Sequence, residues 1–582
     1  MTRRASILAY CLVIALGLLG LQSWDIAVGR VEQRVIAAVE ERTGLVLSGM
    51  QRAEIALLPL PRISLVDVGF SHPEAGLTGS AARIKARARL LPLLAGRISF
   101  DRIDLVAPQI AVEIPETETG LGDWLQRPLA SLEHLRHQSR IAIAGGSVFL
   151  RRQGTIESIL RDVNLFVGAR ETGQPLDLSG SLTWRGEPTE VALIWPMAAG
   201  RGRVMLSANA APMKLRFEGM RSSPQDGVIT GQTTLSSPSL PDLLGWFGEQ
   251  PRLAAATGAL SLTADTVVKP HEVSLGTVSI GLDGDRLDGA LKLSDAGGRL
   301  ALAGTLAGAE LDLGRLLGRL PLRAVTTADT APLAFDAWTA QDIDLRVSVD
   351  TARLNGARLS DVATYLLVKK GRFETGLLRA SAYGGTAKGR FLASATPAGV
   401  DIKLQGVLDR VNLGQFAGDA QPLRLGGTGN LQFALDGIGN TTEQLLSSLS
   451  GKASLALRQG EIGGIALAEL LRRSEAGPLA ALRSDWRHGK TAFDTASLQF
   501  GIVNGIAAVT EGVLAAPAYR ATLAGQIALP TRRIDMGLQL VSANGGQFLP
   551  FTLRGELDNP TLDLDSEALT RRAFTLPTNL SR

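Results

Sequence analysis

Ile343-Asp344-Leu345-Arg346-Val347-Ser348-Val349-Asp350 alternates apolar and polar side chains without an error. Successive side chains of a β-strand point to opposite faces of a sheet, so this stretch predicts a strand with one buried face and one face in water. Val400-Asp401-Ile402-Lys403-Leu404-Gln405 has the same pattern, and shorter alternating runs occur at residues 141–143 and 562–565. The sequence therefore predicts strands at widely separated places along the chain.

Turn signals separate these runs. Asp283-Gly284, Gly297-Gly298 and Asn544-Gly545-Gly546 are typical of tight hairpin turns, and the chain has 65 glycines among 582 residues. The two-residue period recurs after Gly44 over most of the chain, with a loose internal similarity but no strict repeat length. We therefore expect a mainly β protein built on a long antiparallel meander.

Short helices are expected to interrupt this meander. Helical spacing of apolar residues predicts helices over residues 26–43, 122–137, 240–247 and 466–474. A further helix should begin near Thr441 and end before Gly451, because Thr441 to Gln444 fits a capping box.

The N-terminus has the features of a membrane anchor. Arg3 and Arg4 precede an uncharged apolar run from Ala5 to Leu21, and Trp24 follows it. About 17–25 apolar residues span a bilayer, and basic residues tend to stay on the cytoplasmic side. A cleaved signal peptide is the alternative, but no good cleavage site follows the run. The expected anchor residues are Ile7, Leu8, Leu12, Val13, Ile14, Leu16, Leu18 and Leu19.

Composition limits the classes of function. At 582 residues the chain is too long for one compact core. The formal net charge is +4, and the basic residues form no stripe interleaved with aromatic residues, so nucleic-acid binding is not expected. Cys11 is the one cysteine, which leaves no internal disulfide and no cysteine metal site.

Three short motifs are better explained by structure than by chemistry. Residues 488–491 (HGKT) match the end of a phosphate-binding loop, but Ser484 stands where the first glycine is required. Asp283–Gly289 is like a calcium loop, except that its third acid and its glycine are each displaced by one place. His134 and His137 share a helical face without a third ligand nearby. We therefore expect no catalytic centre, no metal site and no cofactor.

Two regions of the sequence resemble the AsmA-like family of bacterial envelope proteins. In the first, residues 42–70 (RTGLVLSGMQRAEIALLPLPRISLVDVGF) precede Leu90-Leu91-Pro92-Leu93-Leu94-Ala95-Gly96 and a strand that ends at Pro108. In the second, residues 427–471 (GTGNLQFALDGIGN…IALAELL) precede residues 491–507 and 549–565. The order of these blocks is more specific than any one of them.

The resemblance implies an architecture and a location. Family members are anchored in the inner membrane, have a β-rich periplasmic body and are related to TamB-type proteins and to chorein-type bridges that transfer lipid. Such proteins form a long curved sheet, groove-like or taco-like, whose apolar inner face shelters acyl chains. The candidate lining residues here are Ile343, Leu345, Val347, Val349, Val400, Ile402 and Leu404. For any single strand, the core of an ordinary β-sandwich is the alternative.

Five regions follow from these patterns. They are a cytoplasmic stub and transmembrane anchor (1–24), an AsmA/chorein-like region with a leading helix (25–170), a central β-repeat region (171–420), an AsmA-like C-terminal region (421–565) and a tail (566–582).

The expected function is shelter or transfer of phospholipid by a single-pass inner-membrane protein with a cytoplasmic N-terminus, in support of outer-membrane lipid homeostasis. The expected partners are the membrane, phospholipids and further inner- or outer-membrane proteins. The alternative is a non-enzymatic scaffold that assists assembly of outer-membrane proteins through its sheet edge.

Overall fold

The computed structural model describes residues 24–25, 33, 36–37, 40, 46–49, 51–56, 60–72, 76–89, 92, 100–114, 140–152, 155–169, 174–196, 201–222, 228–247, 258–296, 299–317, 332–333, 335–354, 357–417, 426–463, 466–474, 489–543, 548–557, 559–565 and 567–568. The expected anchor residues from Ile7 to Leu19 and the helix expected over 122–137 lie outside this set. Of the helix expected over 26–43, four residues are described and all are helical: Gln33, Ile36, Ala37 and Glu40. Within the described part of the chain, no helix is both long enough and apolar enough to cross a bilayer.

The chain divides into two compact units, which are described separately. Unit 1 comprises Met1–Arg252 and Thr257–Ala301, and unit 2 comprises Leu253–Ala256 and Leu302–Arg582. The region boundaries predicted at residues 170 and 420 fall inside these units and remain predictions.

Both units consist mainly of β-strands. The strands of unit 1 are β1 (Trp24–Asp25), β2 (Val46–Ser48), β3 (Arg52–Ala56), β4 (Arg62–His72), β5 (Leu77–Ala88), β6 (Phe100–Ile114), β7 (Arg140–Arg152), β8 (Thr155–Ala169), β9 (Leu176–Trp184), β10 (Glu187–Trp195), β11 (Gly202–Ala210), β12 (Met213–Arg221), β13 (Ile229–Ser237), β14 (Leu260–Lys269), β15 (Glu272–Leu282) and β16 (Asp285–Ala296). β17 (Arg299–Asp312) begins at the end of unit 1.

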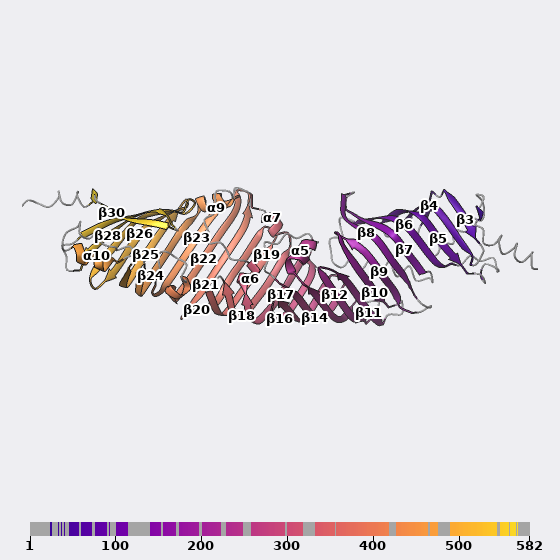
Figure 1. Cartoon of the computed structure of the whole chain (residues 1–582), viewed down its shortest axis with the longest axis horizontal. Coiled ribbons are helices and arrows are strands. Elements are labelled where there is room, and N and C mark those ends of the chain that lie inside the picture. The colour runs from indigo at the N-terminus through magenta and orange to yellow at the C-terminus, as the bar shows by residue number, and fades with distance from the viewer. Residues whose placement is uncertain are drawn as a thin grey trace, which may run out of the picture. The chain divides into compact units, whose positions relative to one another are not determined.

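Unit 2 continues with further long strands. They are β18 (Asp342–Leu354), β19 (Ala357–Lys369), β20 (Arg372–Ala382), β21 (Gly385–Thr396), β22 (Gly399–Asn412), β23 (Thr428–Gly439), β24 (Ser450–Gly463), β25 (Lys490–Val503), β26 (Ile506–Ala516), β27 (Tyr519–Ala528), β28 (Arg533–Ser542), β29 (Phe548–Glu556) and β30 (Asn559–Leu564). Each pairs antiparallel with the next strand along the chain. Figure 1 shows them side by side in one open, curved sheet that ends at the yellow strands β28 and β30.

The structure gives bounds for six helices between or beside the strands. They are α5 (Leu240–Phe247) in unit 1 and α6 (Leu313–Leu317), α7 (Phe335–Trp338), α8 (Leu413–Ala417), α9 (Thr442–Ser448) and α10 (Leu467–Ser474) in unit 2. α5, α9 and α10 lie where the sequence predicts helices. α6, α7 and α8 were not predicted, because four or five residues are too few to show a helical period.

One pair of neighbouring strands in unit 1 corrects the expected meander. β6 and β7 are parallel, with Ile103 opposite Ile141 and Leu105 opposite Ile143. Parallel neighbours need a crossover connection of about a dozen residues or more, and residues 115–139 supply that length. A strictly antiparallel order is therefore wrong at this pair, because the alternating pattern of a strand does not reveal the direction of its neighbour.

The alternating stretch that predicts the fold forms β18. Leu345 and Val347 are half-buried and Val349 is buried, whereas Arg346 and Ser348 are exposed. One face of the strand is thus apolar and the other is polar, as the period of two requires. The prediction of a mainly β chain with a long, curved, open sheet and few helices is confirmed, and the transmembrane helix that precedes it remains untested.

The N-terminal cap of α9 also follows from the sequence. Thr441 Oγ1 accepts a hydrogen bond from the backbone N–H of Gln444 at 3.2 Å. The side chain of Gln444 reaches back one residue further than in a standard capping box, because its Oε1 accepts from the backbone N–H of Asn440 at 2.8 Å.

We expect Thr441→Ala to destabilise α9 locally by about 1 kcal/mol, because it removes the acceptor for the Gln444 N–H. The measurement is amide hydrogen exchange, in which α9 should exchange faster while β23 keeps its protection. Thr442→Ala changes the next residue without removing the cap and serves as the control. Equal exchange in the two variants would contradict the assignment of Thr441 as the cap.

Candidate functional site

One row of paired positions, most of them apolar, crosses the sheet of unit 2 from strand to strand. Residues opposite each other in an antiparallel pair point to the same face, so the register of each pair extends the row by one strand. From β18 to β29 the row runs Leu345, Leu366, Thr375, Phe391, Leu404, Leu435, Gly451, Ile502, Ala507, Ile527, Ile534 and Gly555. We call this row the lining row, and the side of the sheet that carries it the apolar face.

The two predicted groups of lining residues lie on this same face. Leu345 and Leu404 both belong to the lining row, and Ile343, Val347 and Val349 lie beside Leu345 on β18. On β22, Val400 and Ile402 lie beside Leu404 and have the same orientation. The register thus brings together residues that are more than fifty positions apart in sequence.

Burial divides the apolar face into an open part and a covered part. Leu345, Leu366, Phe391, Leu404 and Leu435, which lie between β18 and β23, are all half-buried. Further along the same row Ile502, Ala507 and Ile534 are buried, and Ile527 between them is half-buried. A closed sandwich core would bury the first group as completely as the second, so the lining row is open from β18 to β23. Val349 and Val368 lie beside it on the same face and are buried.

A short helix covers one margin of the open part. Phe335 of α7 is buried against Ala393 and Val400, and Phe373 and Ile402 pack around the same cluster. Val400 therefore contributes to a packed cluster as well as to the apolar face, a role that the alternating pattern alone does not show.

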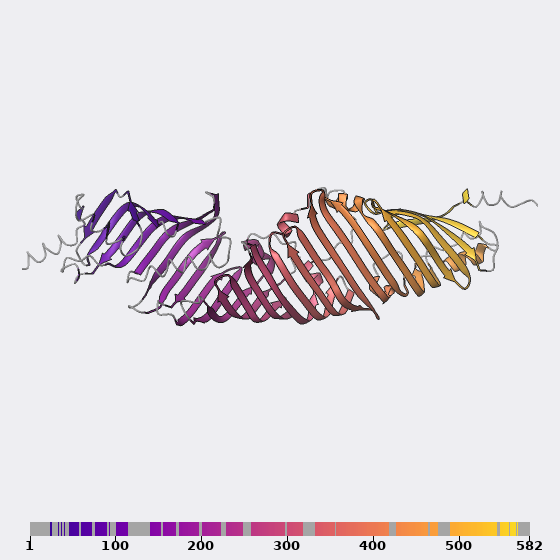
Figure 2. The same ribbon diagram turned by 180° about the vertical axis from the view of Figure 1, so that it is seen from behind.

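A second helix covers the C-terminal part of the face. Leu467, Leu470 and Leu471 of α10 pack against residues of β24 to β29 that share the orientation of the lining row. The residues they cover or adjoin are Leu457, Phe493, Ala496, Leu514, Tyr519, Ala521, Leu540, Leu549 and Phe551. Figure 2 shows the orange and yellow strands of this part of unit 2 from the other side.

The sheet of unit 1 also has an apolar face. Leu193, Leu206 and Phe217 are consecutive partners across β10, β11 and β12. Val191, Ala208 and Leu215 are also partners, two residues further along each strand on the same face. Leu243 and Trp246 of α5 pack on this face with Ala210 and Met213. In both units, therefore, short helices pack on parts of an otherwise single-layered apolar face.

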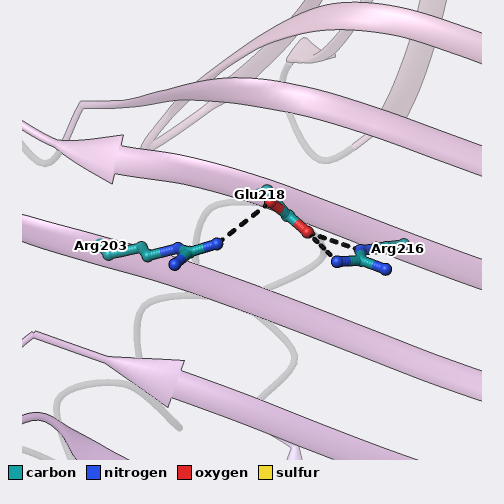
Figure 3. A network of polar contacts seen from close by, with 3 residues as sticks. All are labelled: Arg203, Arg216 and Glu218. Carbon is teal, nitrogen blue, oxygen red and sulfur yellow. Dashed lines mark hydrogen bonds and ion pairs between the residues drawn. The ribbon is translucent and has the colours of Figure 1, made fainter.

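The opposite faces of the two sheets are polar. In unit 1, Glu218 accepts hydrogen bonds from Arg216, with Nε at 2.6 Å, and from Arg203 Nη2 at 3.3 Å, as Figure 3 shows. The hydrogen bond from Arg216 is the main cause of a lowered pKa at Glu218. All three side chains reach water, so this network is a solvated part of the polar face.

A more buried ion network lies on the polar face of unit 2. The carboxylate of Glu374 accepts hydrogen bonds from Arg372 Nη2 at 2.7 Å, Tyr365 Oη at 2.8 Å and Arg390 Nε at 3.0 Å. Its side chain is 8% exposed, whereas both arginines are about half exposed. The hydrogen bond from Arg372 is the main cause of the lowered pKa of Glu374. These contacts join β19, β20 and β21 across the polar face.

The structure describes two of the three motifs that the sequence analysis rejected, and places them in a turn and at the start of a strand. Asp283 and Gly284 have φ values of 46° and 96° and form the tight turn between β15 and β16. Lys490 and Thr491 begin β25, and Lys490 Nζ lies 2.7 Å from Glu461 Oε1. His134 and His137 lie outside the described residues. No group of three His, Cys, Asp or Glu side chains in the described part of the chain is arranged to hold a metal ion.

An open sheet with one long apolar face defines a class of protein that fits a role in lipid transfer or in the cell envelope. The family comparison agrees: the model of the AsmA family matches residues 324–511. This match supports assignment of the chain to the AsmA-like family. No curated protein and no solved structure matches it.

The matched residues differ in part from those that carried the sequence resemblance. They include residues 427–471 and 491–507, as expected, but also residues 324–420, where no family motif was recognised. That stretch contains β18 to β22 and hence all seven candidate lining residues. The N-terminal block from residue 42 to Pro108 lies outside the match.

Proposed function

We propose that this protein shelters the acyl chains of phospholipid on the apolar face of unit 2 and thereby moves lipid across the bacterial envelope. The observation that supports this is the lining row, whose large apolar side chains stay half-buried from β18 to β23. Half-buried side chains leave apolar surface on which an acyl chain can lie. Each methylene removed from water contributes about 0.8 kcal/mol, so even partial coverage of one chain gives useful affinity.

The proposal includes the location of the protein. The apolar run from Ala5 to Leu21 would anchor it in the inner membrane with Arg3 and Arg4 in the cytoplasm, and the body would lie in the periplasm. Headgroups would stay in water, so we expect little discrimination among phospholipid classes. No catalytic step is part of this function.

Photo-crosslinking from the two faces of one strand tests the proposal. In cells with labelled phospholipid, the full chain would carry a photoreactive phenylalanine analogue in place of Leu435, which lies in the lining row on β23. The matched control carries it in place of Ala434, which is exposed on the opposite face. We expect labelled lipid on the first variant and little on the second.

The same experiment separates the proposal from the scaffold alternative. Crosslinks to protein but not to lipid from Leu435 would favour assistance of outer-membrane protein assembly. Equal lipid labelling from Ala434 and Leu435 would also contradict shelter on the apolar face.

A further inference from the structure

The covered part of the apolar face in unit 2 is not covered across its whole width. On β26, Val509 is half-buried although Ala507 and Leu514 on the same face are buried. On β28, Leu538 is likewise half-buried between two buried neighbours. Half-buried apolar residues on β25 and β27 join these two positions. We call the following set the narrow strip: Leu498, Phe500, Val509, Leu523 and Leu538.

The narrow strip is continuous with the open part of the apolar face. Phe433 on β23 is paired with Ala453 on β24, which is paired in turn with Phe500 on β25. Phe500 is paired with Val509, and all four residues are half-buried. An acyl chain on the open part can therefore extend along the strip without leaving apolar surface.

One side of the strip is bounded by the row of residues that lies under α10. From β24 to β29 the consecutive partners in this row are Leu457, Ala496, Leu514, Ala521, Leu540 and Leu549. All six are at most 7% exposed and belong to one cluster with Leu467, Leu470 and Leu471 of α10. Side chains buried this completely leave no surface on which an acyl chain could lie.

The other side of the strip is bounded by the lining row itself. Ile502, Ala507 and Ile534 are buried on β25, β26 and β28. Side chains on one face of a strand repeat every two residues, which is about 7 Å. With buried residues on both sides, the strip on β26 and on β28 is one side chain wide, or about 7 Å.

The open part of the face is wider. Each strand from β18 to β23 has two or three consecutive half-buried positions on this face, as in Ile343, Leu345 and Val347 of β18 and Leu431, Phe433 and Leu435 of β23. The width decreases to two positions on β25 and to one on β26 and β28, whereas β27 between them keeps three uncovered positions. The apolar face thus has two narrow places near its C-terminal end.

We propose that the narrow strip holds one acyl chain at a time. Lipids with a single chain, such as lysophospholipids and fatty acids, then reach β28, whereas two-chain phospholipid stays on the wider face from β18 to β24. A second chain beside the first would lie over buried side chains and remain in water, which costs about 0.8 kcal/mol for each methylene left exposed.

The inference rests on the proposed function, because it assumes that acyl chains lie on the apolar face. The two can nevertheless fail separately. Lipid on the open part tests the proposed function, whereas the difference between one-chain and two-chain lipids at β28 tests the narrow strip.

Photoreactive lipids that carry the same acyl chain provide the test. The probes are decanoyl lysophosphatidylcholine, didecanoyl phosphatidylcholine and decanoic acid, each with a diazirine at the end of every chain. The full chain in nanodiscs would be irradiated with each probe, and the labelled residues would be identified by mass spectrometry. Decanoyl chains are shorter than the distance of about 19 Å between β24 and β28, so a lipid held in the open part cannot label Leu538 with one of its tails.

We expect the lysophospholipid and the fatty acid to label both Leu435 and Leu538. For the two-chain probe, the ratio of labelling at Leu538 to labelling at Leu435 should be at least fivefold lower. Labelling of Leu538 by decanoic acid but not by the lysophospholipid would support a one-chain strip and restrict its ligands to fatty acids. Equal ratios for the one-chain and two-chain phosphatidylcholines would overturn the inference, as would labelling of Leu435 without any labelling of Leu538. Absence of labelling at Leu435 with every probe would contradict the proposed function, and the inference with it.

A substitution that fills the strip gives a second test. Leu538→Trp places a larger side chain at a narrow place and should lower single-chain labelling of β28 and β29 at least fivefold, while labelling of Leu435 stays the same. Gln539→Trp is the matched control, because Gln539 is the next residue and is exposed on the opposite face. Circular dichroism checks that both variants keep the sheet. Equal labelling of β29 in the two variants would also contradict the proposal.

Discussion

Replacing Leu345 and Leu404 together with aspartate should remove most of the phospholipid that co-purifies with the full chain. Both residues lie in the lining row and both are half-buried, so each carboxylate would face the acyl chain at the place where it rests. Placing an ionised carboxylate against an apolar surface costs several kcal/mol unless water solvates it, and water admitted there displaces the chain. A loss of about 1.4 kcal/mol in binding already lowers occupancy tenfold.

The measurement is lipid mass spectrometry on equal amounts of purified full-length protein, and we expect at least a tenfold decrease. The control changes the next residue on each strand, Arg346→Asp with Gln405→Asp. Both of those side chains are exposed on the polar face, so the two added carboxylates point into water. The proposed function is wrong if the control loses as much lipid as the double variant, or if the double variant retains its lipid while remaining folded.

Glu374→Gln should lower the free energy of unfolding by about 2–3 kcal/mol at neutral pH. The carboxylate holds two arginines and a tyrosine hydroxyl at 2.7 to 3.0 Å, and its side chain is 8% exposed. Hydrogen bonds to a charged, largely buried group contribute more than exposed ones, and removing the charge leaves Arg372 and Arg390 without their common partner. Thermal or denaturant unfolding followed by circular dichroism measures the change.

The pH dependence of the same variant has a definite sign. Because its pKa is lowered in the folded protein, Glu374 stabilises the fold above its unfolded value of about 4.5, and this contribution disappears as the pH falls through the folded pKa. The difference in stability between wild type and Glu374→Gln should therefore shrink at acidic pH.

An exposed ion pair in the same unit provides the comparison for Glu374. Asp535 Oδ1 lies 3.1 Å from Arg554 Nε, and both side chains are 66% exposed. We expect Asp535→Asn to cost about 0–1 kcal/mol, since water solvates either partner alone. Equal effects of Glu374→Gln and Asp535→Asn would show that burial adds nothing at Glu374.

Several parts of the fold follow directly from local sequence. The period of two predicts β18 and β22 because a half-buried strand must alternate, and the spacing of Leu240, Leu243 and Phe247 predicts α5 with its bounds. The conformation of these elements depends on residues that are close together in the sequence. They can therefore be predicted from a single sequence.

Other parts depend on contacts that no local pattern contains. The alternation of β18 shows that one of its faces is apolar, but only the register of the intervening strands shows that Leu345 and Leu404 lie in one row. The burial of Val400 under Phe335 joins residues from different segments. The parallel pairing of β6 and β7 depends on the path of their connection.

The antiparallel order of β18 to β30 also determines how the length of this sheet can change. Each strand adds about 4.8 Å across the sheet, so one hairpin adds about 10 Å. Insertion or loss of a complete hairpin, such as β20 with β21, would return the chain to the same edge and leave every later side chain on its original face. Loss of a single strand would reverse the direction of all that follow, and the next connection would have to cross the sheet. A sheet of this kind can therefore lengthen or shorten in evolution by whole hairpins, that is, by two strands at a time.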